Sequence, residues 1–217
     1  MSIALSIGNN LTTGGVFTAD AVNNTSVTNV TDFASVPGGG VLKLLSTQTA
    51  SASASIEFTS DIDSTYDSYV FKFINIHFAN DDTDFRFNMS TDGGSNYNVT
   101  KTTTMFRAYH TEAGTSGSLE YSSSEDLAQS TGDGYLNWDV GAGSDENVSG
   151  EMWLFNPSST TFVKHFIART SSVHSASAEL DAYQAGYANT TSAINAIQFK
   201  ATSGNIDDGI IKMYGVV

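Results

Sequence analysis

The stretch YDSYVFKFINIHF, residues 66–78, is the strongest strand signal in the chain. Successive side chains of a strand alternate between two faces. One face here carries Tyr69, Phe71, Phe73 and Asn75, and the other carries Val70, Lys72, Ile74 and Ile76. Both faces are largely apolar, so we expect a central strand that is covered on both sides.

Similar runs continue on both sides of this stretch. Short β-branched and aromatic segments recur between Gly, Asn, Asp and Ser clusters, and amphipathic helical faces are nearly absent. The expected strands are 41–45, 49–58, 83–89, 97–110, 134–140, 149–156, 160–170, 193–202 and 208–217. We expect a long loop at 111–134, whereas residues 174–189 are ambiguous. About eight strands after residue 45 predict an all-β fold, an antiparallel β-sandwich of jelly-roll-like type.

The first 45 residues differ from the rest. They contain short candidate strands at 2–7, 16–18 and 26–30 but few large aromatics. After the last of these strands comes a linker signal, Pro37-Gly38-Gly39-Gly40. We therefore divide the chain into a short β-rich N-terminal attachment or assembly segment, 1–45, and a β-sandwich head domain, 46–217.

Composition excludes several classes of protein. The formal charge is −14, and because phosphate binding depends on Lys and Arg, nucleic acid is excluded as the main partner. The absence of cysteine excludes disulfides and zinc–thiolate sites. No stretch approaches the roughly 20 apolar residues of a membrane span, and residues 1–15 lack the features of a secretory signal. We expect a protein that is made in a cytoplasm, does not insert into membranes, and leaves by lysis.

The pattern Ser90-x-Asp92-x-Gly94-x-x-Tyr97 marks a tight turn. Asp92 can accept hydrogen bonds from backbone N–H groups, Gly93 and Gly94 tolerate positive φ, and Tyr97 can pack back on the turn. We expect 83–89 and 97–110 to form an antiparallel hairpin around it. The pattern resembles the Asp-box hairpin of sialidases. That family repeats the motif and uses it structurally, whereas here it occurs once, with Tyr where Trp is usual, so the resemblance implies a structural turn.

No constellation indicates catalysis. The carboxylate clusters 61/63, 81/82/84, 145/146 and 207/208 lie at expected turns, and the four histidines lack metal-binding spacing. The chain also lacks a GxSxG elbow and a phosphate-binding GxxxxGK[ST] loop. We expect no enzyme activity and no cofactor. Two metal sites remain open alternatives. One is calcium bound by Asp81, Asp82 and Asp84, because calcium takes oxygen ligands. The other is a metal held by histidines stacked around a trimer axis.

Exposed aromatic side chains could stack on sugar rings. The candidate glycan-contact residues are Tyr109, Tyr121, Tyr135, Tyr183 and Tyr187, with Trp138 as a further aromatic of this kind. The alternative interpretation places the same side chains in the core or in an interface between protomers.

Two stretches resemble a module of tailed-phage virion proteins from marine and cyanobacterial phages. Residues 55–100 carry its I-D-S-T-Y, F-x-N-I-H and D-G-G-S-x-Y segments, and residues 186–217 carry its closing G-N-I-x-x-G-x-I-x-x-Y-G pattern. The resemblance implies a homotrimeric fibre, tail-tip or capsid-surface protein at the virion surface, without catalytic residues.

Three functions follow from these observations. In the first, residues 1–45 attach the protein to other virion proteins, and loops at 110–134 and 171–190 meet the host surface, with a glycan as the expected ligand. The second is a capsid decoration or head-fibre protein that stabilises the shell. The third, a glycan depolymerase, is the remotest, because the chain shows no β-helix repeat.

Overall fold

The computed structural model describes residues 41–217, which contain twelve strands and no helix. In chain order the strands are β1 (Leu42–Thr49), β2 (Ile56–Phe58), β3 (Ser68–Phe78), β4 (Thr83–Ser90), β5 (Lys101–Thr111), β6 (Gly117–Tyr121), β7 (Gly134–Val140), β8 (Val148–Phe155), β9 (Lys164–His174), β10 (Ala178–Ala188), β11 (Ala196–Ala201) and β12 (Ile206–Val216). The strands expected at 2–7, 16–18 and 26–30 lie outside the described residues.

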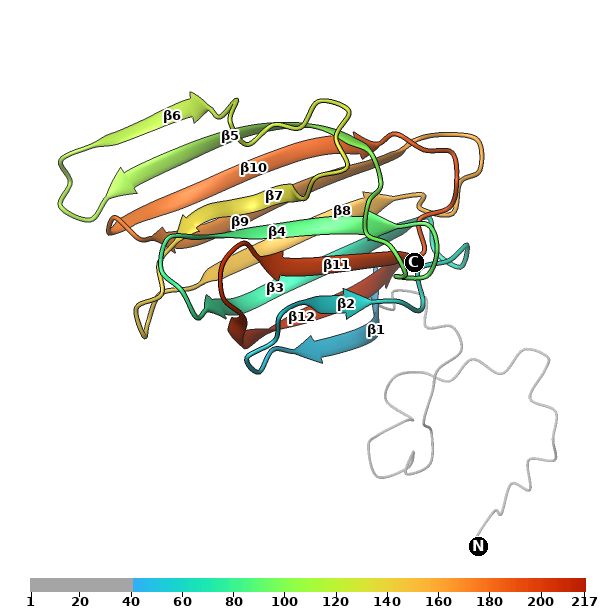
Figure 1. The fold of residues 1–217 in the computed structure, drawn as a ribbon, viewed down its shortest axis with the longest axis horizontal. Helices are drawn as coiled ribbons and strands as arrows, with labels where there is room; N and C mark the ends of the chain where they lie inside the picture. The colour runs from blue at the N-terminus through green and yellow to red at the C-terminus, as the bar shows by residue number, and fades with distance from the viewer. Residues whose placement is uncertain (1–40) are drawn as a thin grey trace, which may run out of the picture. The chain divides into compact units, whose positions relative to one another are not determined.

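The strands form two layers of one antiparallel sheet. The larger layer has the order β6-β5-β10-β9-β8-β3-β12-β1, and the smaller has β7-β4-β11-β2. They join where β7 meets β9, through the single residue pair Val140 and His174. Figure 1 shows the smaller layer lying across the larger one, so that the sheet is nearly closed into a barrel-like shape. The predicted all-β sandwich class is therefore confirmed.

Phenylalanines from both layers form the core between them. Phe73 of β3 packs against Phe85 of β4 and Phe199 of β11, with ring centroids 5.0 and 5.2 Å apart. Phe87 of β4 meets Phe166 of β9 at 5.1 Å. All five rings are at most 2% exposed. Edge-to-face aromatic pairs of this kind add to the free energy gained from burying apolar area.

The strand β3 is central in the larger layer, between β12 and β8, as its sequence predicted. The prediction of two covered faces is wrong for its second half, since Ile74 is 38% exposed. Ile74 lies on the same outer face as Lys72, which the smaller layer does not cover, and a β-bulge follows it. Asn75 has φ 50° and the pairing with β8 shifts between Phe73 and Ile76. The bulge turns Ile76 and Phe78 into the core, so strict alternation fails there.

Three other local predictions are corrected. The strands β4 and β5 do not form a hairpin, because β4 pairs with β11 and β7 while β5 pairs with β10 and β6. The loops expected at 110–134 and 171–190 contain the strands β6 and β10. The run 49–58 is not one strand, because the chain bends at Ala52, with φ 50°, between β1 and β2.

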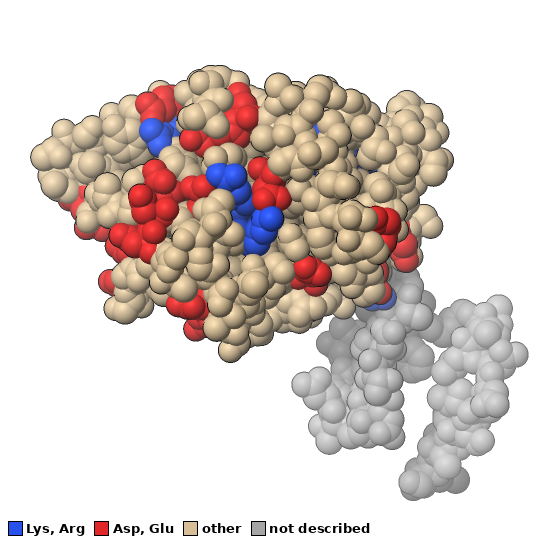
Figure 2. Space-filling view, in the orientation of Figure 1, with Lys and Arg blue, Asp and Glu red and all other residues tan. Residues whose placement is uncertain are grey.

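Residues 42–45 pair with β12 as part of β1, although the sequence placed them in the N-terminal segment. Acidic and basic side chains are mixed on the face of the described residues that Figure 2 draws. Figure 2 shows acidic side chains scattered over the face that carries the smaller layer, with basic side chains in a few small groups among them. Within residues 41–217 there is no helix long and apolar enough to cross a bilayer.

Candidate functional site: a groove on the outer sheet face

The candidate tyrosines divide between the two faces of the larger layer. Tyr121, Tyr183 and Tyr187 lie on its outer face, which the smaller layer does not cover. Tyr109, beside Arg107, lies on the other face and lines a separate hollow of about 130 Å³. Tyr135 also lies elsewhere, on β7, with the Arg86 guanidinium 3.8 Å from its ring centroid. Trp138 is only 5% exposed and packs in a small second core with Met105, Leu180 and Ala182.

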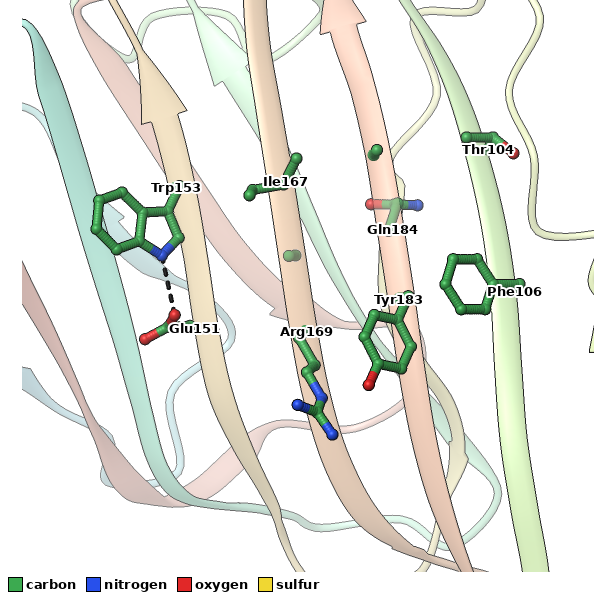
Figure 3. Close-up of a pocket in the computed structure, with 10 residues that line it drawn as sticks. Thr104, Phe106, Glu151, Trp153, Ile167, Arg169, Tyr183 and Gln184 are labelled. Carbon is green, nitrogen blue, oxygen red and sulfur yellow. Dashed lines mark hydrogen bonds between the residues drawn. The ribbon is translucent and has the colours of Figure 1, made fainter. Parts of the chain in front are cut away.

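A groove of about 330 Å³ runs over the outer face of β5, β10, β9 and β8 (Figure 3). Antiparallel register builds it. Trp153 of β8 is directly opposite Ile167 of β9, which is opposite Ala185 of β10. Two residues further along β9, Arg169 is opposite Tyr183, which is opposite Phe106 of β5. Directly opposed residues share a face, so these six side chains line one surface. We call it the sheet-face groove.

One wall of the groove is aromatic and rigid. The rings of Phe106 and Tyr183 are stacked, 4.7 Å apart and within 5° of parallel. The Arg169 guanidinium lies 4.8 Å from the centroid of the Tyr183 ring, and its Nε and Nη2 donate to the two carboxylate oxygens of Asp181 at 3.0 and 2.8 Å. This bidentate pair orients the guanidinium over the Tyr183 ring.

Trp153 forms the opposite wall. Its Nε1 donates to Oε1 of Glu151 at 2.9 Å, and Lys72 of β3 also donates to this carboxylate. Burial acts to raise the pKa of Glu151, but the hydrogen bonds from Lys72 and Trp153 and the charge of Lys72 outweigh it, so the pKa is lowered. The carboxylate therefore stays ionised and anchors the indole ring.

The floor between the walls is apolar and lies close to the backbone of the sheet. Ile167 is 48% exposed and Ala185 is small, so a flat ligand could reach the sheet itself. Beyond Ala185 the surface continues past Tyr187 and His165, whose rings are 6.0 Å apart. Beyond Arg169 it continues into a polar hollow with Ser149, Ser171 and Glu179. The three hollows adjoin along β9 and β10 and make an elongated surface.

The groove is equipped for binding. Its carboxylates Glu151 and Asp181 are each held by a cation, Lys72 and Arg169. A carboxyl group with a lowered pKa, such as that of Glu151, is a poor proton donor, and glycoside hydrolysis requires a carboxyl group with a raised pKa. An apolar floor between aromatic walls with a few fixed polar groups is typical of a ligand site.

The turn at Ser90–Tyr97 lies apart from the groove, after β4. Oδ1 of Asp92 accepts from the backbone N–H of Asn96 at 2.9 Å and from the Ser90 hydroxyl at 2.7 Å. Gly93 and Gly94 have φ of 73° and 90°. The Tyr97 hydroxyl lies 2.8 Å from where a side chain on Gly94 would begin. These contacts describe a local structural turn.

The three aspartates of the candidate calcium site each contact a different partner. Asp81 accepts from the backbone of Ala142, Asp82 from the Ser175 hydroxyl, and Asp84 pairs with Arg86. Within the described part of the chain, no group of three or more His, Asp or Glu side chains could hold a metal ion.

Sequence analysis missed Phe106, Glu151, Trp153, Ile167 and Arg169. A signal was present in β8, where Glu151 and Trp153 alternate with the buried Met152 and Leu154. The sequence of β9 carries no such signal, because Lys164 and Thr170 are buried while Ile167 is exposed. A tryptophan on the face opposite the core residues of its strand indicates a surface aromatic, but the partners across the groove depend on register.

Comparison of the chain with protein-family models, with curated proteins and with solved structures found no match.

Proposed function

We propose that this protein is a non-enzymatic virion surface protein of a tailed phage, a fibre or tail-tip component whose β-sandwich binds a host-surface saccharide in the sheet-face groove. The observation that carries the proposal is the elongated apolar groove between Trp153 and the stacked pair Phe106 and Tyr183. Its walls come from strands fixed by antiparallel pairing, so the site is formed before the ligand arrives.

The shape and chemistry of the groove suit a sugar chain. The faces of aromatic rings carry negative charge density, which attracts the C–H faces of sugar rings. The polar hollow next to Arg169 provides hydroxyl and carboxylate partners for sugar hydroxyls. Because the groove's charges are already paired and the whole chain carries −14, a neutral saccharide fits better than an anionic one.

The remaining parts of the proposal rest on sequence. Residues 1–45 would attach the protein to other virion proteins and assemble a homotrimer.

A decoration protein of the capsid shell is the alternative function. Its support is the exposed apolar edge of the larger layer, where Leu119 and Tyr121 of β6 are 72% and 62% exposed. Apolar edges of this kind are common where proteins meet.

The test is binding of the purified full chain to host envelope polysaccharide, measured by calorimetry. Trp153→Ala should weaken binding about ten-fold or more, because it removes one wall of the groove. Tyr109→Ala is the matched control, since it removes an aromatic from the other face of the same layer, and it should bind like the wild type.

Two outcomes would contradict the proposal. If Tyr109→Ala loses binding while Trp153→Ala keeps it, the site lies on the wrong face. If no envelope polysaccharide binds and phage lacking the protein adsorb normally but lose heads on heating, the decoration role replaces it.

A further inference from the structure

A lysine and an asparagine meet in the interior of the sandwich, away from the sheet-face groove. Lys101 opens β5 and is 0% exposed, and Asn88 near the end of β4 is 2% exposed. Nζ of Lys101 lies 2.6 Å from Oδ1 of Asn88 and 2.8 Å from the carbonyl oxygen of Val99. The amine therefore sits against the side-chain carbonyl of a carboxamide, with water excluded.

The contacts of Asn88 fix the orientation of its amide. Nδ2 donates to the carbonyl oxygen of Thr131 at 3.1 Å, which can only accept, and to Oδ1 of Asp133 at 2.9 Å. Oδ1 accepts from the backbone N–H of Met89 at 2.9 Å as well as from Lys101. The carbonyl is thus polarised by two donors, and the amide nitrogen faces a carboxyl group.

We propose that Lys101 and Asn88 form an intramolecular isopeptide bond after folding, with Asp133 as the group that transfers the proton. The three side chains stand in the order the reaction needs: a nucleophilic amine at the carbonyl, an N–H donor on the carbonyl oxygen, and a carboxyl group on the leaving nitrogen.

The reaction balances without a cofactor. The neutral amine of Lys101 attacks Cγ of Asn88, and the bond from Nζ to Cγ forms while negative charge develops on Oδ1, next to the N–H of Met89. Bond formation brings Nζ onto Cγ beside Nδ2, and one proton then moves from Nζ to Nδ2 by way of the Asp133 carboxyl group, which already accepts from Nδ2. The bond from Cγ to Nδ2 then breaks, and ammonia leaves. Nothing is oxidised or reduced.

The environment increases the neutral fraction of the amine. Burial, the largest cause, and the neighbouring charge of Lys200 lower the pKa of Lys101 to about 8, while the charge of Asp133 acts in the opposite direction. Lys200 also pairs with Asp133 at 2.8 Å, which keeps the carboxylate in place. A lysine that loses its proton at lower pH than usual has a larger nucleophilic fraction near neutrality.

The bond would have a clear structural consequence. It would join β4 of the smaller layer to β5 of the larger one, two strands that do not pair with each other. It would also close a covalent loop around the turn at Asp92. In a chain without cysteine, this is a covalent link between layers that needs no oxidising compartment.

The first experiment is intact-mass spectrometry of the full chain, followed by sequencing of tryptic peptides. The wild type is expected to be lighter than its sequence mass by one ammonia, with the loss on a branched peptide that contains Asn88 and Lys101. A full-mass wild type after prolonged incubation of the folded protein, or a loss located at other residues, would overturn the proposal.

Variants separate the chemistry from folding. Asp133→Asn keeps the shape of the side chain but cannot carry the proton, so it should fold with an unchanged circular dichroism spectrum and retain the full mass. Lys164→Arg is the matched control, because Lys164 is also 0% exposed but donates only to the backbone carbonyls of Thr190 and Ser192. It should still lose ammonia. If folded Asp133→Asn is linked as fast as the wild type, Asp133 is not the proton-transfer group.

Discussion

At the scale of single residues, Asp92 shows how one carboxylate organises a turn. Hydrogen bonds from the Asn96 side chain, the Ser90 hydroxyl and the Asn96 backbone lower the pKa of Asp92 to about 2. All of these contacts lie within seven residues of chain, so the sequence pattern alone could predict them. The turn depends on the ionised form of one exposed side chain, so the contribution of that side chain to stability should depend on pH.

The prediction concerns Asp92→Ala. At pH 7 it should lower the midpoint of thermal unfolding, because it removes the acceptor for Asn96 and Ser90. The folded-state pKa lies below the unfolded value of about 3.9, so the contribution is present above pH 4 and is lost as pH falls through about 2. Thermal melts of both proteins should therefore converge near pH 2.

Glu112→Ala is the control for this measurement. Glu112 is exposed, and its carboxylate accepts no side-chain hydrogen bond from residues 41–217. Its substitution should leave the midpoint nearly unchanged at both pH values. A difference between wild type and Asp92→Ala that stays constant down to pH 2 would show that packing, and not the ionised carboxylate, holds the turn.

At the scale of elements, the paired bulges in β3 and β12 decide which side chains reach the core. Gly209 of β12 has φ 118°, and the register with β3 shifts on both sides of Asp208. A Cβ on Gly209 would lie 2.6 Å from the carbonyl oxygen of Asn75, which is backbone and cannot move aside. Both the conformation and the close approach require glycine here.

Gly209→Ala should therefore destabilise the fold by about 2–5 kcal/mol, the sum of a left-handed-region cost and an overpacking cost. Gly114→Ala is the matched control. Gly114 has φ 66° but nothing within 4 Å of its Cβ position, so it should lose only about 1–2 kcal/mol. Urea unfolding of the two variants measures both values. Equal losses would mean that β12 moves away from β3 without cost.

The elements also show what the sequence could predict. The strands β3, β7, β8, β11 and β12 were recognisable because each is a short run rich in β-branched and aromatic side chains between Gly, Asn, Asp and Ser clusters. The strand β6 was not recognisable from its sequence. Gly117–Tyr121 forms a strand because each of its residues pairs with a residue of β5. The strand β10 was hidden by Ala, Gly and Gln in inward or central positions, where β propensity is weak. Expecting a hairpin at Asp92 failed for a related reason, because the strands beside a turn need not pair with each other.

At the scale of the whole molecule, the sheet-face groove exists only because four strands distant in sequence lie in register. Trp153, Ile167, Tyr183 and Phe106 come from β8, β9, β10 and β5, and no local pattern relates them. The smaller layer covers one face of the larger layer and leaves this one open (Figure 1). Tyr183 was predicted as an exposed aromatic residue, whereas Trp153 and Phe106 were not, and no sequence pattern predicted that the three are neighbours.

Net charge makes a last prediction about the ligand. A chain with charge −14 repels anions over a distance set by salt, about 30 Å at 0.01 M and about 3 Å at 1 M. A neutral saccharide held by apolar and aromatic contacts should bind with nearly the same affinity at both salt concentrations. Calorimetric titrations with envelope polysaccharide at low and high salt check this. Binding that strengthens steeply with salt would indicate an anionic saccharide held against repulsion, and binding that weakens steeply would indicate that Lys72 and Arg169 leave their carboxylates to contact an anionic ligand.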